Sequence, residues 1–125
     1  MPGVPAFIRR RLYVKGSLQN SLGGWRFTLR NTLGSGYAKG MVPLRLDEID
    51  EIPMERTSFE NDGLIVTFDQ VNEENTFGLE MNREIVITVA GEQLTTGSHS
   101  VYFGCIVPGL GHIGFDFTDD VEGGA

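Results

Sequence analysis

TTGSHSVYFGCIVPGLGHIGFDFTDD, residues 95–120, decides the fold of this chain. On both sides of PGLG (108–111), apolar side chains alternate with other residues, as is typical of half-buried strands joined by a turn. The apolar positions are Val101, Phe103, Cys105 and Val107 before the turn, and Ile113, Phe115 and Phe117 after it. The stretch therefore predicts a β-hairpin in which residue numbers summing to about 219 lie opposite one another, so that His99 faces Asp120.

The same period of two recurs outside the hairpin, whereas no segment of ten or more residues carries a capped helical period. Further strands are predicted at 10–14, 25–30, 42–46, 64–68 and 84–89, and a helical turn at 53–58. Strands at this spacing, separated by glycine-rich turns, are typical of antiparallel all-β domains. We predict a single all-β domain over 1–125, an antiparallel β-sandwich of about seven to nine strands, with residues 1–6 and 121–125 flexible. A small flattened β-barrel is the alternative.

Composition and charge exclude several classes of protein. The net charge of −7 at pH 7 argues against nucleic-acid binding, which needs a basic surface. No apolar stretch approaches 18 residues, so no membrane interaction is expected. The N-terminus lacks the apolar core of a signal peptide, and one cysteine cannot form an internal disulfide. We expect a cytoplasmic protein.

The hairpin holds both histidines and the cysteine, but their predicted positions argue against a shared reaction site. His99 and His112 lie about eight residues apart along the ribbon, on the order of 26 Å, so they cannot bind one metal ion. We expect His99 to point inward and to hydrogen-bond a loop, His112 to point outward, and Cys105 to be a buried structural thiol. No catalytic, cofactor-binding or metal-binding residue is assigned in this chain, so no cofactor is expected in it.

Other stretches have structural interpretations, with one candidate surface. The acidic run at 46–56 lacks the residue order of a calcium loop and is predicted to be a solvated turn. Trp25 is in phase with a buried face, and the glycine-rich stretch 36–43 is predicted to be a loop that covers a ligand or docks on another chain. The predicted rim of an interface or a pocket consists of Tyr37, Met41, Pro108, Leu110 and His112.

The order of segments resembles the β-subunit family of C-glycoside deglycosidases, which are small all-β proteins. The resemblance spans most of residues 8–119. It lies in a G-[FW]-x-F strand (24–27), an I-D-x-x-x-I-P-like turn (49–53) and an L-x-x-G-x-H-x-V strand entry (94–101).

This resemblance implies an accessory subunit rather than a free-standing enzyme. The partner would be a larger TIM-barrel α-subunit that holds a divalent metal, manganese, and cleaves 3-oxo C-glycosides by β-elimination. The β-subunit would stabilise this partner in a hetero-oligomer and help cover its active site, meeting the sugar-derived molecule only indirectly. Two alternatives stay open: a stand-alone β-barrel isomerase or cyclase, and a non-catalytic module that binds carbohydrate or protein.

Overall fold

The computed structural model describes residues 10–31, 36–61 and 63–122. Short 3-10 helices (η) connect the strands, and the elements follow in chain order: η1 (Arg10–Leu12), β1 (Gln19–Ser21), β2 (Gly24–Arg30), β3 (Gly36–Ala38), β4 (Gly40–Leu46), β5 (Asp50–Glu51), η2 (Met54–Arg56), β6 (Thr57–Asn61), β7 (Leu64–Thr67), η3 (Phe68–Gln70), β8 (Phe77–Leu79), β9 (Glu84–Ala90), β10 (Gly97–Val107) and β11 (Gly111–Val121). In this described part of the chain, no helix is both long and apolar enough to cross a membrane.

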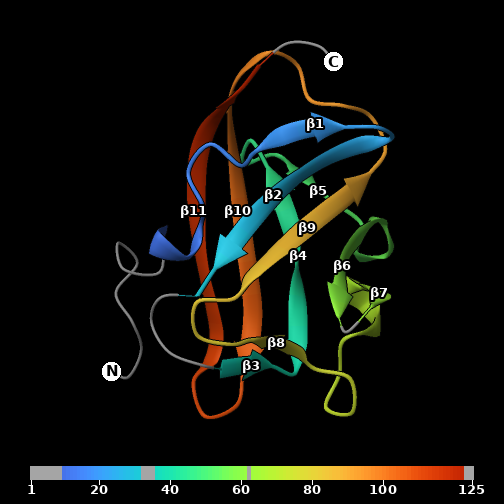
Figure 1. Cartoon of the computed structure of the whole chain (residues 1–125), viewed down its shortest axis with the longest axis vertical. Coiled ribbons are helices and arrows are strands. Elements are labelled where there is room, and N and C mark those ends of the chain that lie inside the picture. Colours follow the sequence, from blue (N-terminus) through green and yellow to red (C-terminus); the bar gives the residue numbers. More distant parts are fainter. Residues whose placement is uncertain (1–9, 32–35, 62, 123–125) are drawn as a thin grey trace.

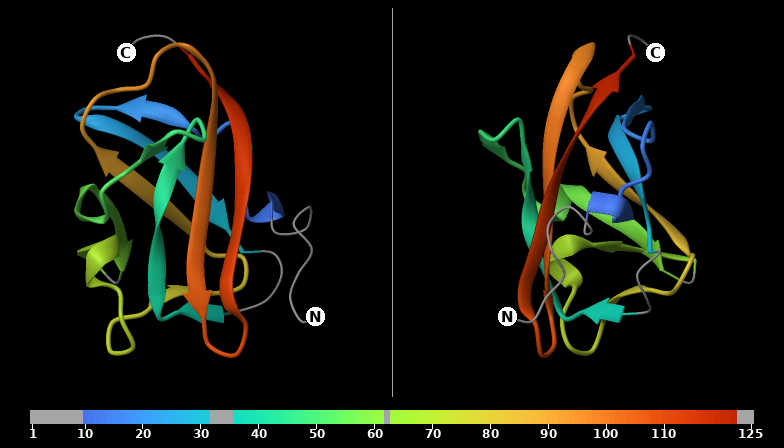
Figure 2. Two further views of the ribbon diagram at one scale, coloured as in Figure 1. Left: turned by 180° about the vertical axis from the view of Figure 1, so that it is seen from behind. Right: turned by 90° about the vertical axis from the view of Figure 1, so that its left-hand side faces the viewer.

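The strands form two layers that face each other (Figures 1 and 2). One layer is a five-stranded sheet of order β1-β2-β9-β6-β7, and the other is a four-stranded sheet of order β11-β10-β4-β5. A small β3-β8 sheet lies at the end of the molecule near the β10–β11 turn (Figure 2, right). All pairings are antiparallel, which confirms the all-β prediction. Among the described residues none of the three sheets closes on itself, so the barrel alternative is wrong.

The core lies between the two layers and follows the predicted alternation. In β9 the side chains of Ile85, Ile87 and Val89 are buried while their neighbours are exposed, because successive side chains in a strand point to opposite faces. Trp25 is buried at 2% exposure, as its phase predicted. The four-stranded sheet adds Phe103, Phe115 and Phe117 to the same core, so the hairpin that decides the fold also supplies much of its aromatic packing.

The β10–β11 hairpin exists, but its register differs by one from the prediction. Val107 pairs with Gly111, and His99 faces Asp119 instead of Asp120. The turn is tighter than assumed: the N–H of Leu110 donates to the carbonyl of Val107 at 3.1 Å. Gly109 and Gly111 both take positive φ, which leaves three residues between the paired strands.

Two predicted segments are wrong. Residues 10–14 do not form a strand: they contain η1 and a single bridge between Tyr13 and Leu29. The stretch 36–43 is not a loop but belongs to β3, which pairs with β8 in the small sheet, and to β4, which pairs with β10 in the four-stranded sheet. The predicted helical turn at 53–58 is confirmed as η2, and the acidic run at 46–56 contains the turn between β4 and β5, as predicted.

The chain ends differ in part from the prediction. Val121 was placed in a flexible tail, but it ends β11 and is buried at 2% exposure. Residues 1–6 and 123–125 lie outside the described residues.

Candidate functional site

His99 of β10 contacts two loops, one through each of its ring nitrogens. Its Nδ1 lies 2.8 Å from Oδ2 of Asp47, in the β4–β5 turn, and its Nε2 lies 2.8 Å from the carbonyl oxygen of Thr95. Asp47 also accepts the N–H of Ser100 at 2.9 Å and donates its own N–H to the Ser100 carbonyl at 2.7 Å. This confirms that His99 hydrogen-bonds a loop, and we call the group the His99 clamp.

The carboxylate and carbonyl acceptors of the His99 clamp favour a charged ring, and the Thr95 hydroxyl oxygen lies 3.2 Å from the same Nε2. A carboxylate and a carbonyl can only accept, so a hydrogen on both nitrogens, as in imidazolium, satisfies both contacts. Burial would lower the pKa of His99, but the bonds to Asp47 and Thr95 outweigh it and raise that pKa above 6.5. Burial would raise the pKa of Asp47, but the Ser100 N–H and the His99 ring outweigh it and lower that pKa below 3.8. Both shifts favour the ion-paired form of these two side chains, which has a structural role in the fold.

Tyr13 and Asp119 form a second contact between distant segments. The Tyr13 hydroxyl donates to Oδ2 of Asp119 at 2.6 Å and accepts the N–H of Leu18 at 3.0 Å, and Asp119 also accepts the N–H of Gly16 at 2.6 Å. The Tyr13 ring stacks on Phe117 with centroids 3.7 Å apart. Burial and the bond to Asp119 raise the pKa of Tyr13 to about 12, so the phenol stays protonated. This contact fixes the segment before β1 onto β11.

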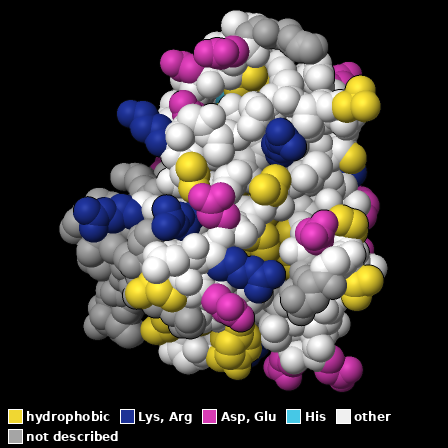
Figure 3. Space-filling view, viewed as in Figure 1, with side chains coloured by type: hydrophobic (Ala, Val, Ile, Leu, Met, Phe, Trp, Pro, Cys, Tyr) yellow, Lys and Arg dark blue, Asp and Glu magenta, His cyan; other side chains and the backbone are white. Residues whose placement is uncertain are grey.

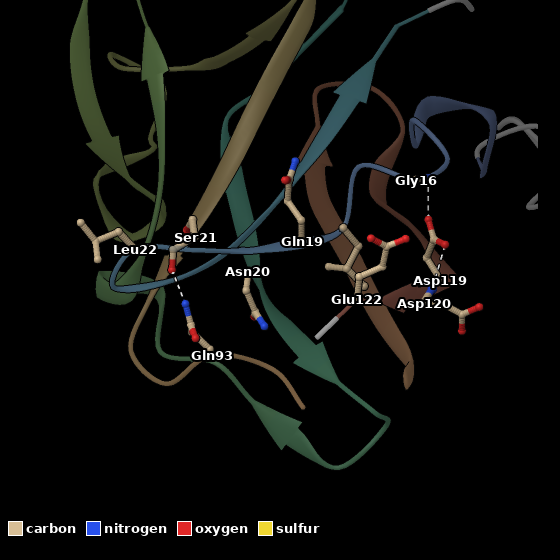
Figure 4. A pocket seen from close by; sticks show the side chains of 10 residues that line it. Gly16, Gln19, Asn20, Ser21, Leu22, Gln93, Asp119, Asp120 and Glu122 are labelled. Atoms are coloured by element: carbon tan, nitrogen blue, oxygen red, sulfur yellow. Dashed lines mark hydrogen bonds between the residues drawn. The ribbon is translucent and has the colours of Figure 1, made fainter. Parts of the chain in front are cut away.

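A cleft of about 790 Å³ lies beside this contact, between β1 and the end of β11 (Figure 4). One wall is formed by the end of β11 with Asp119, Asp120 and Glu122, and another by the residues of β1 with Gln93. Such walls favour cations and hydroxyl groups over anions.

Part of the cleft wall already has structural contacts. The Asn20 amide exchanges two hydrogen bonds with the backbone of Leu94, at 2.9 and 2.7 Å. Gln93 donates to the carbonyl of Ser21 at 2.9 Å. These amides tie β1 to the loop before β10, so they are occupied before any ligand arrives.

Cys105 is placed as an unreactive thiol. It lies on the core side of β10, packs against the buried cluster, and burial raises its pKa to about 11. Since the thiolate is the nucleophile, a thiol with this pKa is a poor one near neutral pH. Cys105 therefore packs against the core as predicted, although it is partly rather than fully buried.

Tyr102 and His112 meet on the outward side of the hairpin. The Tyr102 hydroxyl lies 2.9 Å from Nε2 of His112. The tyrosine side chain lies over a glycine pair, because a Cβ at Gly114 would fall 1.9 Å from the hydroxyl oxygen, and one at Gly104 3.1 Å from ring carbon Cε2. An aromatic side chain over paired glycines covers backbone that would otherwise be exposed. This places His112 outward, as predicted.

The five predicted rim residues do not form one group. Tyr37 and Pro108 line a hollow of about 340 Å³ together with Lys39 and Glu73, and Leu110 is exposed at the hairpin turn. Met41 points into the core at 8% exposure and so does not contribute to a surface. The role of the exposed members stays a prediction.

The sequence did not reveal Asp47, Tyr13 or Asp119 as contact residues. Their partners lie 52 or 106 positions away, and local periodicity carries no signal at that range. The correct hairpin register would have drawn attention to Asp119, because it places this residue opposite His99. No group of three or more His, Cys, Asp or Glu side chains suited to a metal ion occurs within the described residues.

A family model described as hydroxymethylglutaryl-CoA reductase, N-terminal domain, matches residues 8–122. The chain belongs to this family. The match covers β1 through β11, so it includes both layers of the sandwich and every contact described above. No protein in a search of curated sequences matches the chain.

Membership of the reductase N-terminal domain family overturns the resemblance to C-glycoside deglycosidase β-subunits. It also overturns the lyase function inferred from that resemblance, and it supports neither the isomerase nor the binding-module alternative. The quoted motifs misled because they are generic: G-[FW]-x-F and L-x-x-G-x-H-x-V are glycine turns entering alternating strands. In this chain the histidine of the second motif, His99, makes the structural contact with Asp47 described above.

Proposed function

We propose that this chain is a non-catalytic domain that accompanies the catalytic polypeptide of a hydroxymethylglutaryl-CoA reductase and acts by binding it. The observation that carries the proposal is the family match over 8–122, whose description names a domain of that enzyme. The hetero-oligomer predicted from the sequence is retained in this form. The TIM-barrel partner and its manganese rested on the deglycosidase resemblance and are not part of the proposal.

The contacts of the described side chains support the non-catalytic part of the proposal. His99 is held between Asp47 and Thr95, Tyr13 is held protonated by burial and Asp119, and Cys105 is partly buried with a raised pKa. Each of these groups is already engaged in the fold, and none is placed to move a proton to a substrate.

The test combines the purified chain with the reductase catalytic polypeptide of its source organism. Light scattering after size exclusion should give a stoichiometric complex, and hydroxymethylglutaryl-CoA should be consumed by the catalytic polypeptide and not by the chain alone. Turnover by the chain alone would contradict the non-catalytic role. Failure to form a complex, or the absence of such a polypeptide from the organism's genome, would contradict the partner.

A further inference from the structure

The outer face of the four-stranded sheet has the composition of a docking surface, and this inference rests on the proposed function. Inward side chains of β10 and β11, such as Val101 and Phe117, belong to the core, so the alternate positions point away from it. We define the outer face by these alternate positions and the neighbouring strand edge: Val42, Arg45, Glu48, Glu51, Ser100, Tyr102, Gly104, Ile106, His112, Gly114, Asp116, Thr118 and Asp120.

The centre of the outer face is partly apolar. Gly104 and Gly114 face each other across the strands, and Tyr102 lies over them with its hydroxyl fixed to His112. Ile106, on the same side of β10, is half-buried. An aromatic ring held in one position loses little conformational entropy on binding, which is why tyrosine is common at interface centres.

The border of the outer face is acidic. Glu51 lies on β5 and Asp120 on β11, the two edge strands of the sheet, and Glu48 follows the β4 end. With Asp116 these make four carboxylates against one cation, Arg45. A hollow of about 290 Å³ lies inside the border, where Arg45, Glu48, Ser100, Tyr102 and Asp116 meet.

The opposite, five-stranded face has a different charge pattern. Figure 3 shows that face, with basic and acidic side chains interspersed. Its strands carry exposed Arg26 and Arg30 on β2, and exposed Glu60 and Glu84 on β6 and β9. The two faces of the sandwich therefore differ in charge pattern, and among the described strands the outer face of the four-stranded sheet combines a central tyrosine with a mostly acidic border.

The charge of the outer face indicates which kind of partner can bind there. A second copy of this chain would bring one acidic border against another, in a molecule that already carries a net charge of −7. A partner with basic side chains around an apolar centre would instead find complementary charge at the border and the fixed ring of Tyr102 in the middle. We propose that this domain docks through the outer face of its four-stranded sheet onto a basic-rimmed surface of the reductase catalytic polypeptide.

The experiment compares two charge-reversal variants for binding to the catalytic polypeptide by biolayer interferometry. The face variant carries Glu51→Lys and Asp120→Lys, and the control variant carries Glu60→Lys and Glu84→Lys on the opposite sheet. Each substitution adds two positive charges, so both variants change the net charge from −7 by four units to −3. All four sites are exposed, and thermal unfolding verifies that both variants fold.

We expect the face variant to bind at least about tenfold more weakly at about 0.1 M salt, mainly through slower association, and the control variant to stay within about twofold of the wild type. Equal losses in both variants, or a greater loss in the control, would overturn the docking face while leaving the proposed function intact. If the wild-type chain itself does not bind, both the docking face and the proposed function are overturned.

Discussion

Replacing His99 by glutamine should make the stability of the chain less dependent on pH. The substitution removes the imidazolium ring, which carries a positive charge and donates one hydrogen bond to Asp47 and another to Thr95. A hydrogen bond to a charged group contributes about 1.5–3 kcal/mol and a neutral one about 1 kcal/mol. The Asp47 side chain is 40% exposed, so solvent screens its charge and we use values near the lower end of these ranges for the two hydrogen bonds. We therefore expect the unfolding free energy to fall by about 2 kcal/mol in total at about pH 5.5.

The sign of the pH dependence follows from the direction of the shift. The pKa of His99 is raised above 6.5 in the folded chain, so its contribution is complete below pH 6.5 and is lost as the pH rises through the folded value. The pKa of Asp47 is lowered below 3.8, so its contribution is complete above pH 3.8 and is lost as the pH falls through its folded value. The clamp therefore stabilises the fold most between about pH 3.8 and about pH 6.5.

Urea denaturation of both proteins at about pH 5.5 and about pH 9 tests this reasoning. The difference in unfolding free energy between wild type and His99→Gln should shrink to about 1 kcal/mol at the higher pH, since the neutral ring keeps one donor. His112→Gln is the control, because it removes the other histidine without touching Asp47. A difference that stays constant between the two pH values would refute the charged clamp.

Three further changes test the other contacts. Tyr13→Phe removes the hydrogen bond to Asp119 but keeps the ring, and urea denaturation should show a loss of about 1–2 kcal/mol. Gly114→Ala places a Cβ where the Tyr102 hydroxyl lies, and thermal unfolding should show a loss of about 1–3 kcal/mol. Cys105 should react with a thiol reagent far more slowly in the native chain than in urea, because burial raises its pKa to about 11.

Each of these predictions has its own control. Gly78→Ala should be mild beside Gly114→Ala, because no atom lies within 4 Å of its added Cβ and its φ is not positive. A Tyr13→Phe chain as stable as the wild type would mean that water replaces the hydroxyl contacts at no cost. Equal reaction rates of Cys105 in native and unfolded chain would contradict its placement in β10.

The sequence was informative where one strand face is buried. The alternation of β9 and of the hairpin predicted their inward residues correctly, because a sheet covered on one side needs an apolar residue at every second position. The one-residue error in the hairpin register came from the turn, where glycines at positive φ allow more than one loop length. A stretch such as 36–43, with few alternating apolar residues, could not reveal that it continues a sheet.

The candidate site was less predictable, because its contacts join segments far apart in the chain. The sequence predicted a strand at 10–14, yet Tyr13 in that stretch is positioned by Asp119, which local pattern cannot locate. The family was also misjudged from short motifs, each of which only describes a turn entering a strand. Both errors have one cause: local pattern reports burial, and the identity of a partner residue or partner protein is not local information.

The hairpin shows why residues of reactive type gathered in one stretch need not share a site. Along a strand, side chains on the same face are about 6.6 Å apart, and neighbours point to opposite faces. Cys105 therefore faces the core, while Tyr102 and His112 face outward. His99 lies near the start of β10, on the same side of the strand as Cys105, and forms the His99 clamp. A binding site on such a domain must be assembled across several strands of one face, which is why the docking proposal is tested by comparing faces with equal changes in charge.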